Sequence, residues 1–304
     1  MSATALGPSE KASGLKKARN YARHYWWFII PCAVVVLATI LFPWAFTLFM
    51  SVHEWKIGGG REWVGMANYQ KLFGDERFLS SMLRTGYFTL LAVVLPMVLG
   101  TLAALAFHRK FPMRGLARTI FILPMMATPV AVALVWTMMF HPQLGVLNWL
   151  LSQVGIPPSL WIYDVATVIP TLVIVEVWHW TPLVMLIVLG GLASLPVDPY
   201  EAAKIDGANA WQVFRHITLP LLAPFLVVAL IIRAIDALKA FDTIYVITQG
   251  GPGTASETIN IFLYLQAFAY YNMGYASAVV VVFFIIILAL AGLLLWTRAR
   301  VKEI

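Results

Sequence analysis

Six long apolar runs, separated by shorter polar stretches, dominate the hydrophobic pattern of the chain. A helix needs about 20 mostly apolar residues to cross the hydrocarbon core of a bilayer, and each run meets that length. The runs occupy residues 26–52, 85–107, 117–140, 165–192, 219–247 and 275–297. Several contain proline, which a membrane bundle tolerates because neighbouring helices can satisfy the freed carbonyl groups. The pattern therefore predicts an all-α integral membrane protein with six transmembrane helices.

The composition supports this fold class and excludes an ordinary soluble domain. Hydrophobic residues make up 61% of the chain and charged residues 12%, whereas soluble domains have about 45–50% and about 25%. The net charge of +7 comes from short clusters between the apolar runs, so we interpret it as orienting the protein in the membrane and expect no nucleic-acid partner. The single cysteine, Cys32, excludes a disulfide framework and a cysteine metal cluster.

Lys and Arg residues are concentrated in segments that lie on one side of the membrane if there are six spans. These segments are 1–25, 108–118, 193–218 and 298–304, whereas the loops 141–164 and 248–274 contain neither residue type. Cytoplasmic loops are enriched in Lys and Arg, so we expect both termini to be cytoplasmic.

The same reading divides the chain into regions. The run 26–52 is longer than the apolar part of a signal peptide, about 7–15 residues, so we predict an uncleaved first transmembrane helix after a cytoplasmic tail, 1–25. Residues 53–84 form an outer loop, in which Tyr69, Leu72 and Phe73 recur at helical spacing and predict an amphipathic helix on the outer surface. A membrane-embedded core, 85–297, and a cytoplasmic tail, 298–304, follow.

The 193–218 loop has signals for two short helices. Asp198, Pro199 and Glu201 have the spacing of a capping box with proline at the first helical position, and Gly207 favours a helix stop. We therefore predict one helix over Pro199–Asp206 and a second over Ala210–Ile217. Such helices could be a simple connector, but this loop also combines small side chains with free acidic groups. That combination suits docking against another protein.

This loop resembles that of a known family. The family pattern is E-A-A, three residues, G, nine residues, and I-x-L-P, and it is matched here by Glu201-Ala202-Ala203, Gly207 and Ile217-Thr218-Leu219-Pro220. The chain is similar to the permeases of binding-protein-dependent ABC importers, in the carbohydrate branch with the maltose and glycerol-3-phosphate systems. The segments 65–78 and 237–258 are similar to further parts of those permeases. The chain resembles the six-helix members, because it lacks the extra helices and outer domain of the larger maltose permease.

The resemblance implies that the 193–218 loop couples the permease to cytoplasmic ATPase subunits. The residues to which the resemblance assigns coupling are Glu201, Ala202, Ala203, Asp206, Gly207 and Ala208. It also implies a second homologous permease, two ATPase copies, an extracytoplasmic solute-binding protein and a bacterial or archaeal cell membrane. The phosphate-binding motif G-x-x-x-x-G-K-[ST] is absent from the sequence, so we expect no cofactor on this chain and ATP-Mg on the partner ATPases. We interpret Gly250–Gly253 as an outer turn.

Polar side chains within the spans suggest a path for the solute, because ionisable groups in a membrane usually face a cavity or a partner. Arg233, Asp236, Lys239 and Asp242 are spaced three apart with alternating sign, which predicts either a self-neutralising ladder on one helix or a hydrated wall. In the fourth span, Glu176, Trp178 and His179 are polar or aromatic groups suited to a carbohydrate. Bundle packing is the alternative for Trp178, and a hydrogen-bonded core position is the alternative for His179. Our candidates for the path are Glu176, Trp178, Asp236, Lys239 and Asp242.

Two other classes of membrane protein explain the sequence less well. An intramembrane enzyme is disfavoured because H-E-x-x-H and G-x-S-x-G are missing. A channel or secondary transporter would be favoured by internal repeats, and we find none. The solute stays open between sugars, disaccharides, polyols and glycerol phosphates.

Overall fold

The computed structural model describes residues 8–55 and 58–301, with the backbone alone for 8–25 and 297–301. Residues 1–7 and 302–304, which belong to the two predicted tails, lie outside the described residues. The structure is almost entirely helical. Its elements are α1 Pro8–Ser51, β1 His53–Trp55, β2 Arg61–Trp63, α2 Ala67–Phe73, α3 Glu76–His108, α4 Arg114–Met126, α5 Pro129–Met139, α6 Val146–Gln153, η1 Trp161–Tyr163, α7 Val168–Ser194, α8 Asp198–Ile205, α9 Ala210–Val213, η2 Phe214–Thr218, α10 Leu219–Leu238, α11 Asp242–Thr248, α12 Ile259–Tyr264, η3 Leu265–Ala269 and α13 Met273–Val301.

Five helical segments are long and apolar enough to cross a membrane, and a sixth is obtained if one bent pair counts as a span. The five are Trp26–Ser51, Glu76–His108, Val168–Ser194, Ala210–Leu238 and Met273–Trp296. This confirms the predicted all-α membrane fold. A short antiparallel hairpin, in which His53 pairs with Trp63, is an addition that the sequence analysis did not predict.

The third predicted span is not one straight helix. Residues 117–140 are divided between α4 and α5, which meet at an angle of 98°. Ala127 and Thr128 have extended backbone between them, and Pro129 begins α5. Proline disfavours helical backbone in the residue before it and cannot donate the next helical hydrogen bond. The single span expected over 117–140 is therefore corrected to two helices that meet at a sharp bend.

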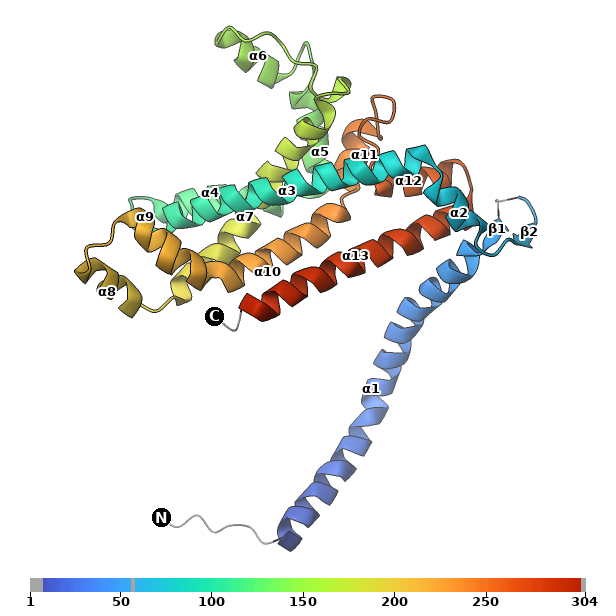
Figure 1. The fold of residues 1–304 in the computed structure, drawn as a ribbon, viewed down its shortest axis with the longest axis horizontal. Helices are drawn as coiled ribbons and strands as arrows, with labels where there is room; N and C mark the ends of the chain where they lie inside the picture. The colour runs from blue at the N-terminus through green and yellow to red at the C-terminus, as the bar shows by residue number, and fades with distance from the viewer. Residues whose placement is uncertain (1–7, 56–57, 302–304) are drawn as a thin grey trace.

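Helices α3, α7, α10 and α13 run side by side as the main bundle, while α1 diverges from it (Figure 1). Helices α3 and α7 pack closely because α3 has glycine at the contact: a Cβ atom on Gly100 would lie 2.6 Å from Cβ of Val184. Helix α1 meets α13 through Trp44, whose ring centroid lies 4.0 Å from that of Phe284. The rest of the candidate span on α1 is almost wholly exposed, as expected for a helix that lipid covers.

The predicted amphipathic helix is present as α2, and its apolar residues have different environments. Leu72 is fully buried in a cluster with Phe78 and Tyr275, and the hydroxyl of Tyr69 donates a 2.7 Å hydrogen bond to Ser51 Oγ. Phe73 is 61% exposed. Helix α2 is therefore bound to the bundle by one face and leaves a single large ring uncovered.

An ion pair joins the first turn of α3 to the loop that precedes α12. The guanidinium of Arg77 donates to both carboxylate oxygens of Glu257, at 2.8 and 2.7 Å. Glu257 is almost completely buried, while the Arg77 side chain is 36% exposed. Bidentate pairs of this kind fix orientation as well as distance, so the pair ties the loop before α12 to the start of α3.

A projecting arm joins α5 to α7 and contains α6 and η1 (Figure 1). Its shape is held by the buried side chain of Asn148. The amide nitrogen donates to the carbonyl oxygens of Pro142 and Ser159, and the amide oxygen accepts from Trp161 Nε1 at 2.7 Å. The amide oxygen also accepts from the Ser159 amide, so one side chain satisfies four backbone or ring groups.

Candidate functional site

The 193–218 loop forms a compact helical knob at one end of the bundle. Helix α8 ends in two hydrogen bonds, from the Gly207 amide to Lys204 O at 3.3 Å and from the Ala208 amide to Ala203 O at 2.9 Å. This pattern is a Schellman motif, which needs a left-handed residue at the position of Gly207. The φ of Gly207 is +73°, and no described atom lies within 4 Å of the place where a Cβ would be. Backbone conformation, not crowding inside this chain, therefore requires glycine here.

The predicted capping box at the start of α8 is absent. Val197 precedes the helix, Asp198 is its first residue, and no side chain caps the free amide groups. Asp198 and Glu201 still lie in the first turn, where negative charge stabilises a helix. A capping box occurs instead at α9, where Asn209 Oδ1 accepts from the Gln212 amide and Gln212 Oε1 accepts from the Asn209 amide.

The second short helix begins at Ala210 as predicted, but it does not end before the fifth span. It continues through the π-helical turn η2 into α10, so that Ala210–Leu238 is one helical segment. Tyr200 on α8 donates a 3.2 Å hydrogen bond from its hydroxyl to Thr218 Oγ1. The knob is thus fixed to the fifth span by continuous helix and by a side-chain contact.

The residues assigned to coupling differ in exposure. Glu201, Ala202, Asp206 and Gly207 are exposed, Ala208 is half-buried, and Ala203 is buried at 7% exposure. The structure brings all six together on one knob. Ala203 faces inward, so within this chain its small side chain serves the packing of α8 against its neighbours.

A buried cluster of charged side chains joins three helices in the middle of the bundle. Arg233 on α10 is completely buried. Its Nη1 donates to Asp236 Oδ2 at 2.6 Å, and its Nη2 donates to Glu176 Oε2 on α7 at 3.1 Å and to Ala92 O on α3 at 3.0 Å. The guanidinium carbon also lies 5.3 Å from the centre of the Trp180 ring. A charge removed from water is tolerated when it is paired and hydrogen-bonded in this way.

The predicted ladder on one helix is wrong, because α10 ends at Leu238. Lys239 and Asp242 lie at the break between α10 and α11, and both are exposed. Asn260 Nδ2 donates to the carbonyl oxygens of Leu238 and Ala240 and so satisfies the backbone freed by the break. Only Arg233 and Asp236 form the expected pair three residues apart.

Glu176 and Trp178 do not lie together, because residues two apart point to different sides of a helix. Glu176 is buried against Arg233, whereas Trp178 is 44% exposed and meets the Trp136 ring edge-on at a centroid distance of 5.6 Å. His179 is buried, and its Nε2 is 3.2 Å from Ala127 O at the bend between α4 and α5. A hydrogen-bonded core position, one of the two expectations for His179, describes it best.

The sequence analysis missed an aromatic cluster beside the break in the fifth span. Phe241 stacks on Tyr245 with ring centroids 5.1 Å apart, and Tyr264 on α12 lies against both rings. Phe268 extends the cluster from Tyr264 at 5.2 Å. The spacing of Phe241 and Tyr245 is a detectable signal, but only the fold brings Tyr264 next to them. Flat aromatic faces beside the break are groups on which sugar rings can pack.

Within residues 8–55 and 58–301, no group of three or more His, Cys, Asp or Glu side chains is placed to hold a metal ion.

Comparison with known proteins bears directly on the knob and the bundle. Residues 96–303 match the family described as "Binding-protein-dependent transport system inner membrane component". The chain is 38% identical over 265 residues to the trehalose/maltose transport system permease protein MalF of Thermococcus litoralis, covering 86% of this chain and 88% of that one. It is 32% identical over 259 residues to the sulfoquinovosyl glycerol transport system permease protein SmoG of Agrobacterium fabrum, covering 84% of each.

Solved structures of a bacterial ABC transporter that imports the acidic polysaccharide alginate have the same fold. One matches with a TM-score of 0.82 and 21% identity, covering 93% of this chain and 99% of that one. A second was solved in complex with an alginate pentasaccharide-bound periplasmic protein and matches with a TM-score of 0.80 and 22% identity, covering 94% and 98%. The family match covers the knob, α7, α10 and the part of α3 from Pro96 onward. The chain is a multi-pass inner membrane protein and belongs to the permeases of binding-protein-dependent ABC transport systems.

Proposed function

We propose that this chain forms half of the translocation pathway of an ATP-driven importer for a sugar, polyol or related carbohydrate. The observation that carries the proposal is the knob of the 193–218 loop, which exposes Glu201 and Asp206 and whose second helix continues without interruption into the fifth span. A rigid knob of this kind can transmit a push from a partner into the bundle. The names of the relatives support the solute class, since trehalose, maltose, sulfoquinovosyl glycerol and alginate all contain sugar.

In this mechanism the ATPase subunits bind the knob and move it when they close on ATP. Glu201 and Asp206 offer charge to the ATPase surface, and Ala202, Gly207 and Ala208 let its backbone approach. Ala203 supports α8 from beneath. Because α9 and α10 are one helical segment, movement of the knob tilts the fifth span and switches the bundle between inward-facing and outward-facing packings.

The assembly contains a second homologous permease, two ATPase subunits with ATP-Mg and an extracytoplasmic solute-binding protein. In the proposed orientation the knob and both termini are cytoplasmic, so that 1–25 and 298–304 are cytoplasmic tails and 53–84 is an outer loop. The outward-facing end then carries the β1–β2 hairpin and the arm with α6.

The solute path passes the break between α10 and α11. Asp236, Lys239 and Asp242 lie at or next to that break in the chain, and Asp236 is 43% exposed although it is paired with Arg233. The cluster of Phe241, Tyr245 and Tyr264 supplies ring faces beside it. Glu176 contributes by holding Arg233, and Trp178 contributes an exposed aromatic edge. These roles predict that Asp236→Ala and Lys239→Ala cut uptake while complex assembly stays intact; normal uptake in both variants would remove these residues from the path.

The coupling role is tested by uptake of labelled trehalose and maltose into cells that express the permeases and binding protein with or without the ATPase. We expect uptake only with the ATPase, and at least a tenfold loss with Glu201→Gln, corresponding to about 1.4 kcal/mol. Asp198→Asn is the matched control, since it removes an exposed acid from the same helix. Uptake without the ATPase identifies a secondary transporter instead.

The orientation is tested by labelling with a membrane-impermeant thiol reagent. In a Cys32→Ser background, Glu201→Cys should react only after the cells are opened. Reaction of this position in intact cells places the knob outside and contradicts the proposal.

A further inference from the structure

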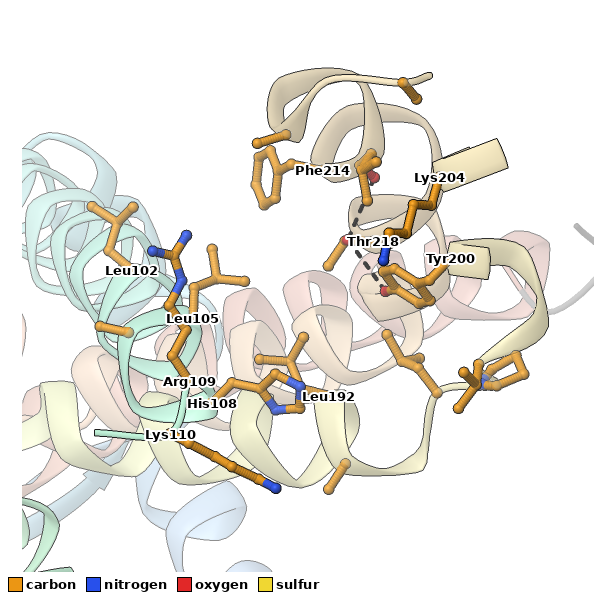
Figure 2. Close-up of a pocket in the computed structure, with 18 of the residues that line it drawn as sticks. Leu102, Leu105, His108, Arg109, Lys110, Leu192, Tyr200, Lys204, Phe214 and Thr218 are labelled. Atoms are coloured by element: carbon orange, nitrogen blue, oxygen red, sulfur yellow. Dashed lines mark hydrogen bonds between the residues drawn. The ribbon is translucent and has the colours of Figure 1, made fainter. Parts of the chain in front are cut away.

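An open groove of about 1350 Å³ lies between the end of α3 and the knob of the 193–218 loop. Figure 2 shows its two walls, with Leu102, Leu105 and Arg109 on α3 or just after it, and Tyr200, Lys204 and Phe214 on the loop. The end of α7 contributes Leu192 to the lining. The hydrogen bond between Tyr200 and Thr218 stabilises the loop wall.

The groove has an apolar part and a cationic part. Leu102, Leu105, Leu192 and Phe214 supply large apolar side chains. Arg109, Lys110 and Lys204 are the cations of the lining, His108 adds an imidazole, and the lining contains no Asp or Glu. In the part of the chain that the structure describes, Arg109, Lys110 and Lys204 take part in no ion pair. The acids of the knob, Glu201 and Asp206, lie outside the lining.

The two parts are arranged along the depth of the membrane. Arg109 and Lys110 follow the last residue of the α3 span directly, so their charges lie at the boundary between lipid and water. Leu102 lies about 10 Å further into the membrane, at 1.5 Å per residue of helix. A ligand that fills the groove therefore needs an anionic head at the boundary and a hydrocarbon portion that extends inward.

We propose that this groove binds an anionic phospholipid of the cytoplasmic leaflet, with its phosphate between Arg109 and Lys204 and one acyl chain along Leu105 and Leu192. The inference rests on the proposed function for the cytoplasmic placement of the knob. Basic pockets between helices at the cytoplasmic surface favour anionic headgroups. Because one wall is the knob and the other is α3, a bound lipid bridges the moving loop and the bundle.

The test uses the purified complex of permeases and ATPase in nanodiscs of phosphatidylcholine with increasing fractions of phosphatidylglycerol. Lipid retained by the complex is measured by native mass spectrometry. The groove variant, Arg109→Gln/Lys204→Gln, removes one cation from each wall. The control variant, Arg61→Gln/Lys71→Gln, removes the same charge from β2 and α2. We expect about thirtyfold weaker retention of phosphatidylglycerol in the groove variant, from about fivefold for each cation, and unchanged retention in the control.

A second variant, Leu105→Asn, tests the apolar part without changing charge and should also weaken retention. Soluble glycerol phosphate serves as competitor: no displacement is expected, and displacement equal to that by the lipid shows a free-phosphate site and overturns the proposal. Equal retention in the groove variant and in the control also overturns it. If Arg109→Gln/Lys204→Gln instead releases the ATPase while lipid retention is unchanged, the cations are ATPase contacts and the lipid site is rejected.

Failure of this proposal can be told from failure of the proposed function. Uptake is measured in closed vesicles that contain the same complex. ATP-dependent uptake that requires Glu201 in vesicles of pure phosphatidylcholine supports the importer assignment whatever the lipid result. Absence of ATP-dependent uptake in every lipid composition contradicts the importer assignment itself.

Discussion

Replacing Arg233 with methionine removes the positive charge from the buried cluster and keeps a long apolar side chain in its place. Arg233 is completely buried and donates to Glu176, to Asp236 and to the carbonyl oxygen of Ala92. The substitution leaves the 3% exposed Glu176 without a partner cation. Asp236 is affected less, because 43% of its side chain remains exposed.

The size of the effect follows from the geometry. At an effective dielectric constant of about 20, unit charges 3.1 Å apart, as in Arg233 and Glu176, attract by about 5 kcal/mol. The cost of removing both charges from water offsets much of that attraction, so the intact pair contributes little net stability. Removal of Arg233 leaves the cost of keeping the Glu176 charge out of water without the attraction that offsets it. We therefore expect Arg233→Met to lower the free energy of unfolding by about 3–5 kcal/mol.

A double-mutant cycle separates this mechanism from simple loss of packing. In Arg233→Met/Glu176→Leu the isolated carboxylate is gone, so most of the lost stability should return, to within about 1 kcal/mol of the natural protein. Glu176→Leu alone should cost about 2 kcal/mol, since Arg233 keeps Asp236 and the Ala92 carbonyl oxygen. Asp236→Asn should cost about 1 kcal/mol or less because of its exposure.

The measurement is unfolding of the purified permease by sodium dodecyl sulfate in mixed micelles, followed by tryptophan fluorescence and circular dichroism. Helical content at zero denaturant checks that each variant folds. The reasoning is refuted if Arg233→Met/Glu176→Leu is as unstable as Arg233→Met, or if Arg233→Met and Asp236→Asn cost the same. Either result would mean that the isolated Glu176 charge is not the source of the instability.

Three further predictions concern other parts of the fold. Gly207→Ala forces a left-handed residue with a Cβ at φ +73° and should lower stability by about 1 kcal/mol and reduce ATP-driven uptake, whereas Gly86→Ala, in open space within α3, should lower neither, because alanine favours the helix. Arg77→Gln leaves the buried carboxylate of Glu257 unpaired and should cost about 2 kcal/mol, seen as faster proteolysis of the 249–258 loop; unchanged cleavage contradicts the role of the pair. Gly100→Leu should cost about 1–3 kcal/mol by overpacking α3 against α7, and a variant that melts at the natural temperature shows that the helices can move apart.

The sequence was sufficient for the fold class and for the position of the knob. Each apolar run predicts a helix by itself, because every backbone group in lipid must be paired within the segment. The end of α8 could also be read locally, since the Schellman motif depends on Gly207 and its immediate neighbours. The start of α8 was predicted less well: Asp198 has suitable chemistry for a cap, but the chain enters the helix one residue earlier, at Val197.

The sequence did not predict where the helices of the third and fifth spans break. Pro129 is visible in the sequence, but the 98° angle is not, because the bend is held by contacts such as that of His179 with Ala127 O. No proline marks the end of α10. Asn260, which lies 22 residues beyond Leu238, satisfies the exposed carbonyl groups there. A local pattern cannot reveal a partner that only folding supplies.

The candidate solute path also has one part that the sequence predicts and another that depends on the tertiary structure. Arg233 and Asp236 lie in an apolar run, so the sequence predicts that they need partners. Their mutual pairing, three residues apart on one helix, can also be predicted from the sequence. The choice of Glu176 and the Ala92 carbonyl, 57 and 141 residues away, depended on the packing of α3 and α7 against α10. The sequence by itself determined which segments enter the membrane, because transfer of a helix into lipid depends on its own side chains. Tertiary structure decided which charges meet, since the pairing of buried groups depends on helices that are distant in the chain and adjacent in space.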